Sequence, residues 1–103
     1  MLVLLKSTYP PSAVKELIEH FMSPKTPPRS PVAKEVASFA YGDRDGYHGL
    51  LILEVEDAKF ADFIKAQTAR SAYLQSRVMG LQVEVIPGHS VMDAIALVSK
   101  QLG

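Results

Sequence analysis

The sequence lacks cysteine, an excess of either charge and any long apolar run. Without cysteine, the chain can form neither a disulfide nor a thiolate metal site, and it has no cysteine nucleophile. Its 11 Lys and Arg residues balance 11 Asp and Glu residues. This balance argues against nonspecific nucleic-acid binding and against an electrostatic membrane anchor, because both need a basic surface. No run reaches transmembrane length, and residues 1–6 are too short for a signal-peptide core. We therefore expect a cytoplasmic protein with no nucleic-acid or membrane partner.

Recognised motifs for cofactors, metals and nucleophiles are also missing. The sequence contains no P-loop, no dinucleotide-binding fingerprint and no nucleophile elbow. Its three histidines are His20, His48 and His89, and none has a partner in a recognised metal-ligand arrangement. Glu16 and His20 lie four residues apart on an expected helix, where a solvent-exposed contact is the simpler interpretation. We expect no metal and no cofactor.

A predicted β-hairpin over residues 32–55 organises the rest of the chain. Its turn, residues 42–46, brackets three polar residues with two glycines, which reach positive φ without steric cost. We predict that Tyr41 pairs with Tyr47 across this turn. The same register sets these further pairs opposite one another: Phe39 and Gly49, Ala37 and Leu51, Glu35 and Leu53, Lys34 and Glu54.

The remaining elements follow from hydrophobic periodicity. In chain order, the pattern predicts a strand at residues 2–9, a helix at 11–22, the hairpin, a helix from 57 to about 70, a strand at 81–86 and a helix at 91–102. Residues 71–79 fit either a further helical turn or a packed loop. Residues 23–31 hold four of the seven prolines and no apolar anchor, so we expect an extended, solvated loop.

The order βαββαβ followed by a helix is the ferredoxin-like plan. Right-handed crossovers place the first and third strands in the centre of a four-stranded antiparallel sheet. Residues 2–5 and 50–53 are apolar on both faces, as central strands should be. We therefore predict one α+β domain over residues 1–103, with an additional C-terminal helix.

Two helices cover only one face of such a sheet. In the predicted register, the other face presents Val36, Ala40, Leu50, Ile52 and one side of the first strand. At about 25 cal/mol per Å², burial of some 400 Å² of this apolar face contributes on the order of 10 kcal/mol before the entropy cost is subtracted. Either the last helix folds back over this face, or a second copy covers it. We favour a homodimer with two sheets face to face, a dimeric α/β barrel, in which the last helix reaches across the edge or the partner.

The pattern of apolar positions over residues 32–88 resembles the dimeric α/β-barrel superfamily, and is most similar to a group of small bacterial proteins of unknown function. The resemblance is carried by the turn at 42–46, the passage 53–57 into a helix with Phe60 and Phe63, and residues 81–87. The superfamily includes cofactor-free monooxygenases, muconolactone-type isomerases, chlorite dismutase-like haem proteins and stress-response proteins. Its enzymes place their sites between sheet and helices or in the dimer barrel. The resemblance implies a fold and an assembly, and it carries no catalytic motif.

The candidate site from the sequence is a pocket around His48 on the uncovered face. Small side chains at Ser38 and Ala40 leave room beside the ring in the predicted register. We predict these ligand-binding residues: Ser38, Ala40, Tyr41, His48, Leu50 and Ile52. Such a pocket suits a small apolar molecule with one polar handle, and His48 could accept a proton from it.

Three interpretations follow from this pocket. The first is a homodimer that binds a small molecule or serves as an interaction module. The alternative is a cofactor-free monooxygenase- or isomerase-type enzyme with His48 as catalytic base. In a simpler view, His48 lies half-exposed near the hairpin tip and forms hydrogen bonds with solvent or a partner. An RNA-binding sheet needs exposed aromatic residues on the central strands, which residues 2–5 and 50–53 do not supply.

Overall fold

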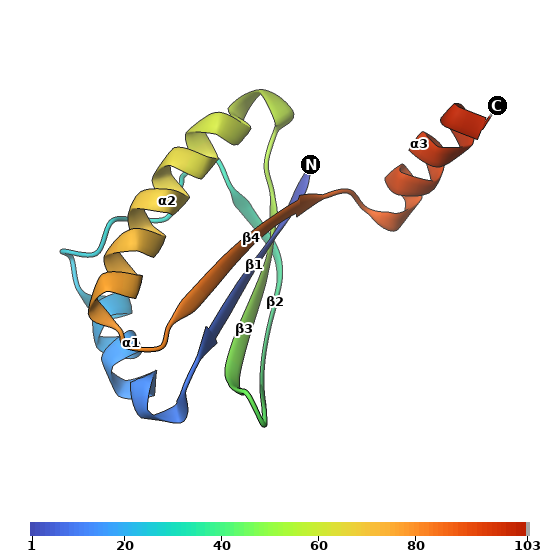
Figure 1. Ribbon diagram of the computed structural model, residues 1–103. Coiled ribbons are helices and arrows are strands. Elements are labelled where there is room, and N and C mark those ends of the chain that lie inside the picture. The colour runs from blue at the N-terminus through green and yellow to red at the C-terminus, as the bar shows by residue number, and fades with distance from the viewer. Residues whose placement is uncertain (103) are drawn as a thin grey trace.

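A four-stranded antiparallel sheet with two helices against one face forms the body of the computed structural model, which describes residues 1–102 (Figure 1). The strands are β1 (Leu2–Tyr9), β2 (Lys34–Asp43), β3 (Gly46–Glu54) and β4 (Gln82–Gly88), and the helices are α1 (Val14–Met22), α2 (Phe60–Arg77) and α3 (Val91–Leu102). Short 3-10 turns precede α1 and α2. The strand order is β2-β3-β1-β4. The α+β class, the antiparallel sheet and the central position of β1 and β3 are confirmed, and the arrangement is compatible with a ferredoxin-like fold.

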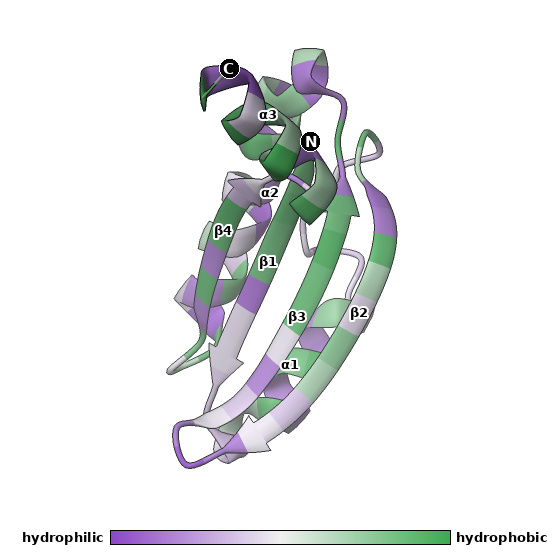
Figure 2. Ribbon diagram, turned by 90° about the vertical axis from the view of Figure 1, so that its right-hand side faces the viewer, coloured by the Kyte–Doolittle hydropathy of each residue, from purple (hydrophilic) through white to green (hydrophobic). Residues whose placement is uncertain are grey.

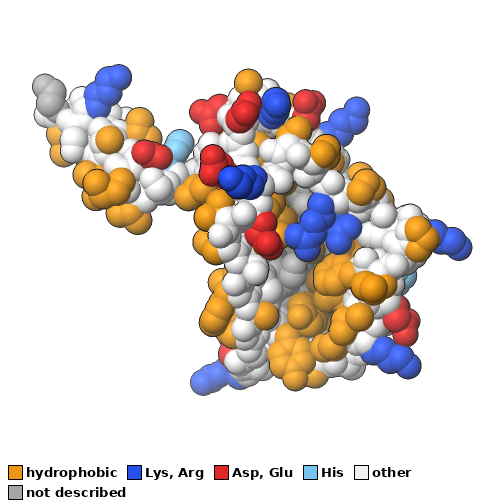
Figure 3. All heavy atoms as spheres, turned by 180° about the vertical axis from the view of Figure 1, so that it is seen from behind, with side chains coloured by type: hydrophobic (Ala, Val, Ile, Leu, Met, Phe, Trp, Pro, Cys, Tyr) orange, Lys and Arg blue, Asp and Glu red, His pale blue; other side chains and the backbone are white. Residues whose placement is uncertain are grey.

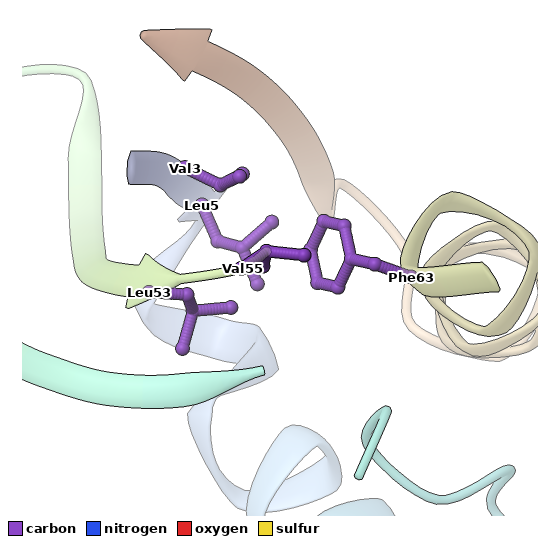
Figure 4. Close-up of a cluster of buried hydrophobic side chains, with 5 residues drawn as sticks. All are labelled: Val3, Leu5, Leu53, Val55 and Phe63. Carbon is purple, nitrogen blue, oxygen red and sulfur yellow. The ribbon is translucent and has the colours of Figure 1, made fainter. Parts of the chain in front are cut away.

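The hydrophobic core lies between the sheet and the two helices. Because side chains alternate along a strand, β1 and β3 direct every second residue toward the helices. Val3 and Leu5 of β1 meet Leu53 at the end of β3 and Val55 just beyond it, and Phe63 of α2 projects its ring toward them (Figure 4). A second cluster of buried residues joins α1 to the end of α2 and consists of Ala13, Leu17, Leu74, Val78 and Leu81. These two clusters fix the helices on one side of the sheet.

A β-bulge at Val36 changes the register of the predicted hairpin. The pairs Lys34–Glu54 and Glu35–Leu53 lie as predicted. Beyond the bulge the predicted pairing is wrong by one residue, because a bulge sets one extra residue into one strand. Tyr41 therefore pairs with His48, and Phe39 pairs with Leu50. Consequently Ser38 and Ala40 lie on the helix side of the sheet, while Ala37, Phe39 and Tyr41 lie on the opposite face.

The turn of the hairpin is also shorter than predicted. Asp43 pairs with Gly46, which leaves only Arg44 and Asp45 between the strands. The backbone N–H of Asp45 donates to Oδ1 of Asp43 over 2.8 Å, and Gly46 has a φ of +121°. Glycine is required at this position, because a Cβ there would lie 2.7 Å from the carbonyl oxygen of Tyr9.

The proline-rich loop between α1 and β2 is anchored rather than freely solvated. Thr26 and Ser30 are buried, and Oγ1 of Thr26 donates to the carbonyl oxygen of His20 over 2.6 Å. Arg70 on α2 donates from Nη1 to the carbonyl oxygen of Pro27 over 2.8 Å. The loop is thus largely exposed, as expected, but it is held by anchors that the sequence did not predict. Its anchors are hydrogen bonds, which an analysis of apolar positions does not detect.

Helices α2 and α3 answer two open questions: the structure of residues 71–79 and the position of the last helix. Helix α2 continues through the ambiguous segment as far as Arg77. Helix α3 covers the predicted residues, and Oγ of Ser90 accepts a hydrogen bond from the backbone N–H of Asp93 over 3.1 Å. None of the α3 residues is buried. The helix leaves the end of β4 and projects on the side of the sheet opposite α1 and α2 (Figures 1 and 2). It does not fold back over the sheet of its own chain.

The sheet face that carries no helix is called the open face here. Apolar residues occur along all four strands, most densely on β1 and β3 (Figure 2). The strand pairings place these apolar residues on it: Leu2, Leu4, Ala37, Phe39, Tyr41, Leu50, Ile52 and Ile86. Among residues 1–102, no helix is both long and apolar enough to cross a membrane.

Candidate functional site

A groove lies between the helices and the side of the sheet that faces them. It has a volume of about 370 Å³. The groove exists because the helices leave the edge strand β2 uncovered, and all ten residues of that strand are exposed. Figure 3 faces this edge and shows hydrophobic side chains gathered in a hollow between the strand and the helices, with Lys and Arg side chains above it.

The floor and walls of the groove are mainly apolar. The sheet contributes floor residues from all four strands, and α1 and α2 contribute the wall. The lining includes Leu5, Tyr9, Ala40, Leu51 and Val83 from the sheet, Leu17 and Phe21 from α1, Leu74 from α2, and Leu81. Phe21 is exposed despite its size. A groove with these walls offers an apolar molecule contact on two sides.

Most polar side chains of the groove lining come from three segments of the chain. Arg29 comes from the proline-rich loop, Glu35 from β2, and Gln67, Arg70 and Ser71 from α2. Gln67 is buried, and its Nε2 donates to Oγ of Ser71 over 2.9 Å. Within residues 1–102, neither arginine forms an ion pair with an acidic side chain.

The guanidinium of Arg70 is held in place at the groove. Its Cζ lies 5.5 Å from the centroid of the Phe21 ring, and its Nη1 donates to Pro27. Burial lowers the pKa of Arg70 from its ordinary value, and the charge of Arg29 lowers it further. An arginine stays protonated at neutral pH even so. Arg29 and Arg70 thus place two positive charges in the groove lining, and neither has an ion pair among residues 1–102.

A smaller cavity of about 220 Å³ adjoins the groove. It shares Leu5, Arg29, Glu35 and Gln67 with the groove and extends toward Phe63 in the core. Gln67 and Arg29 therefore line both cavities.

A second group of polar side chains lies around His48 on the open face. His48 is only 5% exposed. Its Nε2 lies 2.9 Å from Oδ1 of Asp43, and its Nδ1 lies 3.0 Å from Oγ1 of Thr8. The ring stacks on Tyr41, with centroids 4.7 Å apart. The half-exposed histidine of the simpler interpretation is thus wrong, because Tyr41 covers the ring.

The hydrogen bonds around His48 have a definite direction when its Nε2 carries the proton. Nε2–H then donates to Asp43, and Nδ1 accepts from the hydroxyl of Thr8. The hydrogen bond from His48 lowers the pKa of Asp43, and the backbone N–H of Asp45 adds to this effect. Asp43 is therefore ionised at neutral pH. A carboxylate, an imidazole and a hydroxyl in this order can activate the hydroxyl oxygen.

The predicted ligand-binding residues do not come together in one place. Ser38 and Ala40 line the groove on the helix side, together with part of Leu50. Tyr41, His48 and Ile52 lie on the open face. The bulge at Val36 separates the two sets, because it changes the face of every β2 residue that follows it.

Some groove residues left a signal in the sequence and others left none. Gln67 falls on the apolar side of α2 beside Phe63, and a polar residue at such a position indicates a polar site within the core. Arg29 and Arg70 are separated by 41 positions, and only the path of the anchored loop brings them to one groove. Residues 1–102 contain no group of side chains that could hold a metal ion.

No protein-family model matches the chain, and no curated protein or solved structure matches it either.

Proposed function

We propose that this protein is a homodimer that binds a small apolar molecule in the groove between the sheet and the helices. The observation that carries the proposal is the groove itself. Its volume of about 370 Å³ falls within the roughly 300–1,000 Å³ of small-molecule sites, which are mostly apolar and carry a few polar groups. This assigns the ligand to the helix side of the sheet, and the residues Ser38 and Ala40 keep their proposed role there.

The dimer would form through the open face. The apolar residues of this face support the dimeric barrel that the resemblance implies. An apolar surface of this extent is unusual on a monomer. Helix α3 projects on the same side, with the exposed side chains Val91, Met92, Ile95, Leu97, Val98 and Leu102. A second copy related by a twofold axis would cover both surfaces, with each α3 lying against the partner.

The charges on the open face are compatible with self-association. Lys6 pairs with Glu84, and Lys34 pairs with Glu54, so each positive side chain has a negative neighbour on the adjacent strand. A copy of the same face would therefore meet no block of like charge. Because the groove lies on the other side of the sheet, the dimer would leave it accessible to a ligand.

Binding of the neutral fluorescent molecule N-phenylnaphthylamine tests the proposed groove. We expect its fluorescence to rise with the wild-type protein. In the variant Ala40→Phe, a ring would occupy the floor of the groove and the fluorescence rise would be lost. The matched control is Ala72→Phe, which adds the same ring at an exposed position of α2 outside the groove lining. Equal fluorescence with all three proteins would refute binding in the groove.

A second candidate function is supported by the Asp43–His48–Thr8 arrangement. Here His48 would act as the base of a cofactor-free enzyme on the open face, and the dimer barrel would enclose it. A fluorophosphonate reports such activation: Oγ1 of Thr8 forms a bond to phosphorus, fluoride leaves and the hydroxyl proton passes to Nδ1 of His48. Under this function, mass spectrometry finds the label on Thr8 of the wild type and not in the variant His48→Gln. No label on Thr8 would count against it.

A further inference from the structure

We propose that the ligand of the groove is a monocarboxylate with an apolar body, and that Arg29 and Arg70 bind its carboxylate group. This inference rests on the proposed function, because it names the chemical class of the molecule that the groove takes. It goes beyond that function by assigning a binding role to two arginines on separate segments of the chain.

The charges of the groove lining favour an anion. Two guanidinium groups and a single carboxylate, that of Glu35, are the charged groups of this lining. The arginines form no ion pair with Glu35 or with any other acidic side chain of residues 1–102. The lining therefore carries one net positive charge, which a single carboxylate would neutralise.

The position of Arg70 suits a planar acid group. One N–H of its guanidinium is used on the carbonyl oxygen of Pro27, and the group lies over the Phe21 ring. These two contacts restrict the side chain, so that less conformational entropy is lost on binding. The other N–H groups remain for a ligand, and the guanidinium fork matches the two oxygens of a carboxylate.

The electrostatic environment of Arg70 agrees with this geometry. Its pKa is lowered by burial and by the neighbouring charge of Arg29. A bound carboxylate would oppose both effects, because a neighbouring negative charge favours the charged form of the guanidinium. The apolar lining next to the arginines, including Leu17, Phe21 and Leu74, would contact the body of the ligand. A simple inorganic anion would leave these contacts unused.

Isothermal titration calorimetry with two ligands of the same shape tests the inference. Naphthoate carries a carboxylate, whereas naphthamide is its neutral analogue. We expect the wild-type protein to bind naphthoate at least about tenfold more tightly, since hydrogen bonds between charged groups are stronger than those of a neutral amide. The variants Arg70→Gln and Arg29→Gln should lose this preference and still bind naphthamide with an affinity within about threefold of the wild type.

Arg77→Gln provides the matched control for Arg70→Gln. Arg77 is also on α2 and lies 3.6 Å over an aromatic ring, that of Tyr73, yet it does not line the groove. We expect this variant to keep the preference for naphthoate. If it loses the preference as fully as Arg70→Gln does, general surface charge explains the binding and the assignment of Arg70 is overturned.

The outcomes separate this inference from the proposed function. Equal affinity of the wild type for naphthoate and naphthamide would overturn the carboxylate class and leave binding in the groove intact. Binding of naphthoate by Ala40→Phe as strong as by the wild type would overturn the location in the groove. If neither naphthalene compound nor N-phenylnaphthylamine binds, the proposed function fails as well.

Discussion

Tyr41 and His48 stack across the β2–β3 ladder, with ring centroids 4.7 Å apart and planes inclined by 21°. The same histidine reaches Thr8 on β1 and Asp43 at the end of β2. One imidazole therefore connects three strands near the hairpin tip, where few apolar residues are available. This contact explains why a polar ring is almost completely buried on a face that no helix covers.

The variant His48→Ala should unfold more readily than the wild type. It removes a buried ring, and it leaves Thr8 and Asp43 without their shared partner. We expect a loss of about 2–4 kcal/mol in the free energy of unfolding, measured by urea denaturation. His89→Ala is the control, because His89 is exposed and makes no side-chain hydrogen bond among residues 1–102. Similar losses in both variants would contradict the importance of the His48 contacts.

The ionised carboxylate of Asp43 should stabilise the folded protein at neutral pH and lose this effect at acidic pH. Its pKa in the folded state lies below the ordinary value of 3.8, so folding favours the ionised form. The resulting stabilisation is fully present above the ordinary pKa and is lost as the pH falls through the lower, folded value. We expect Asp43→Asn to be less stable than the wild type at pH 6 and the difference to narrow below about pH 4. Urea denaturation at a series of pH values measures it. A difference that stays constant with pH would exclude this charge effect.

Two glycines of β3 should respond in opposite ways to alanine. At Gly46, positive φ and the carbonyl oxygen of Tyr9 at 2.7 Å from an added Cβ make alanine unfavourable. We expect Gly46→Ala to lose about 2 kcal/mol of stability. At Gly49, nothing lies within 4 Å of an added Cβ, so Gly49→Ala should be neutral or more stable by about 0.5 kcal/mol. Thermal unfolding compares the two, and equal losses would contradict the turn geometry.

Periodicity predicted most of the fold, because each strand and helix shows its own pattern of apolar residues. The central strands, the order of the elements and the extent of α3 were all accessible in this way. The bulge at Val36 could not be predicted in this way. Strand β2 is exposed on both sides, so its pattern of apolar and polar residues does not distinguish one face from the other. A single extra residue then separated Ser38 and Ala40 from His48.

The groove was harder to predict than the fold. Its charged residues come from the proline-rich loop and from α2, and hydrogen bonds such as that from Arg70 to Pro27 bring them together. These bonds depend on the path of the loop in three dimensions. Local sequence therefore gives no indication that Arg29 and Arg70 line one cavity, although Gln67 on the apolar side of α2 does indicate a polar site.

Charged substitutions on the open face should separate the proposed dimer. We expect sedimentation equilibrium to give the wild type twice its chain mass of 11.3 kDa. Phe39 on β2 is 64% exposed and Ile95 on α3 is 53% exposed. In a face-to-face dimer, Phe39→Glu or Ile95→Glu would bury an unpaired carboxylate and weaken association at least about a hundredfold. Met79→Glu is the control, since Met79 is 88% exposed and lies in the turn between α2 and β4. A wild-type mass of one chain at micromolar concentration, or dimers in both open-face variants, would contradict the assembly.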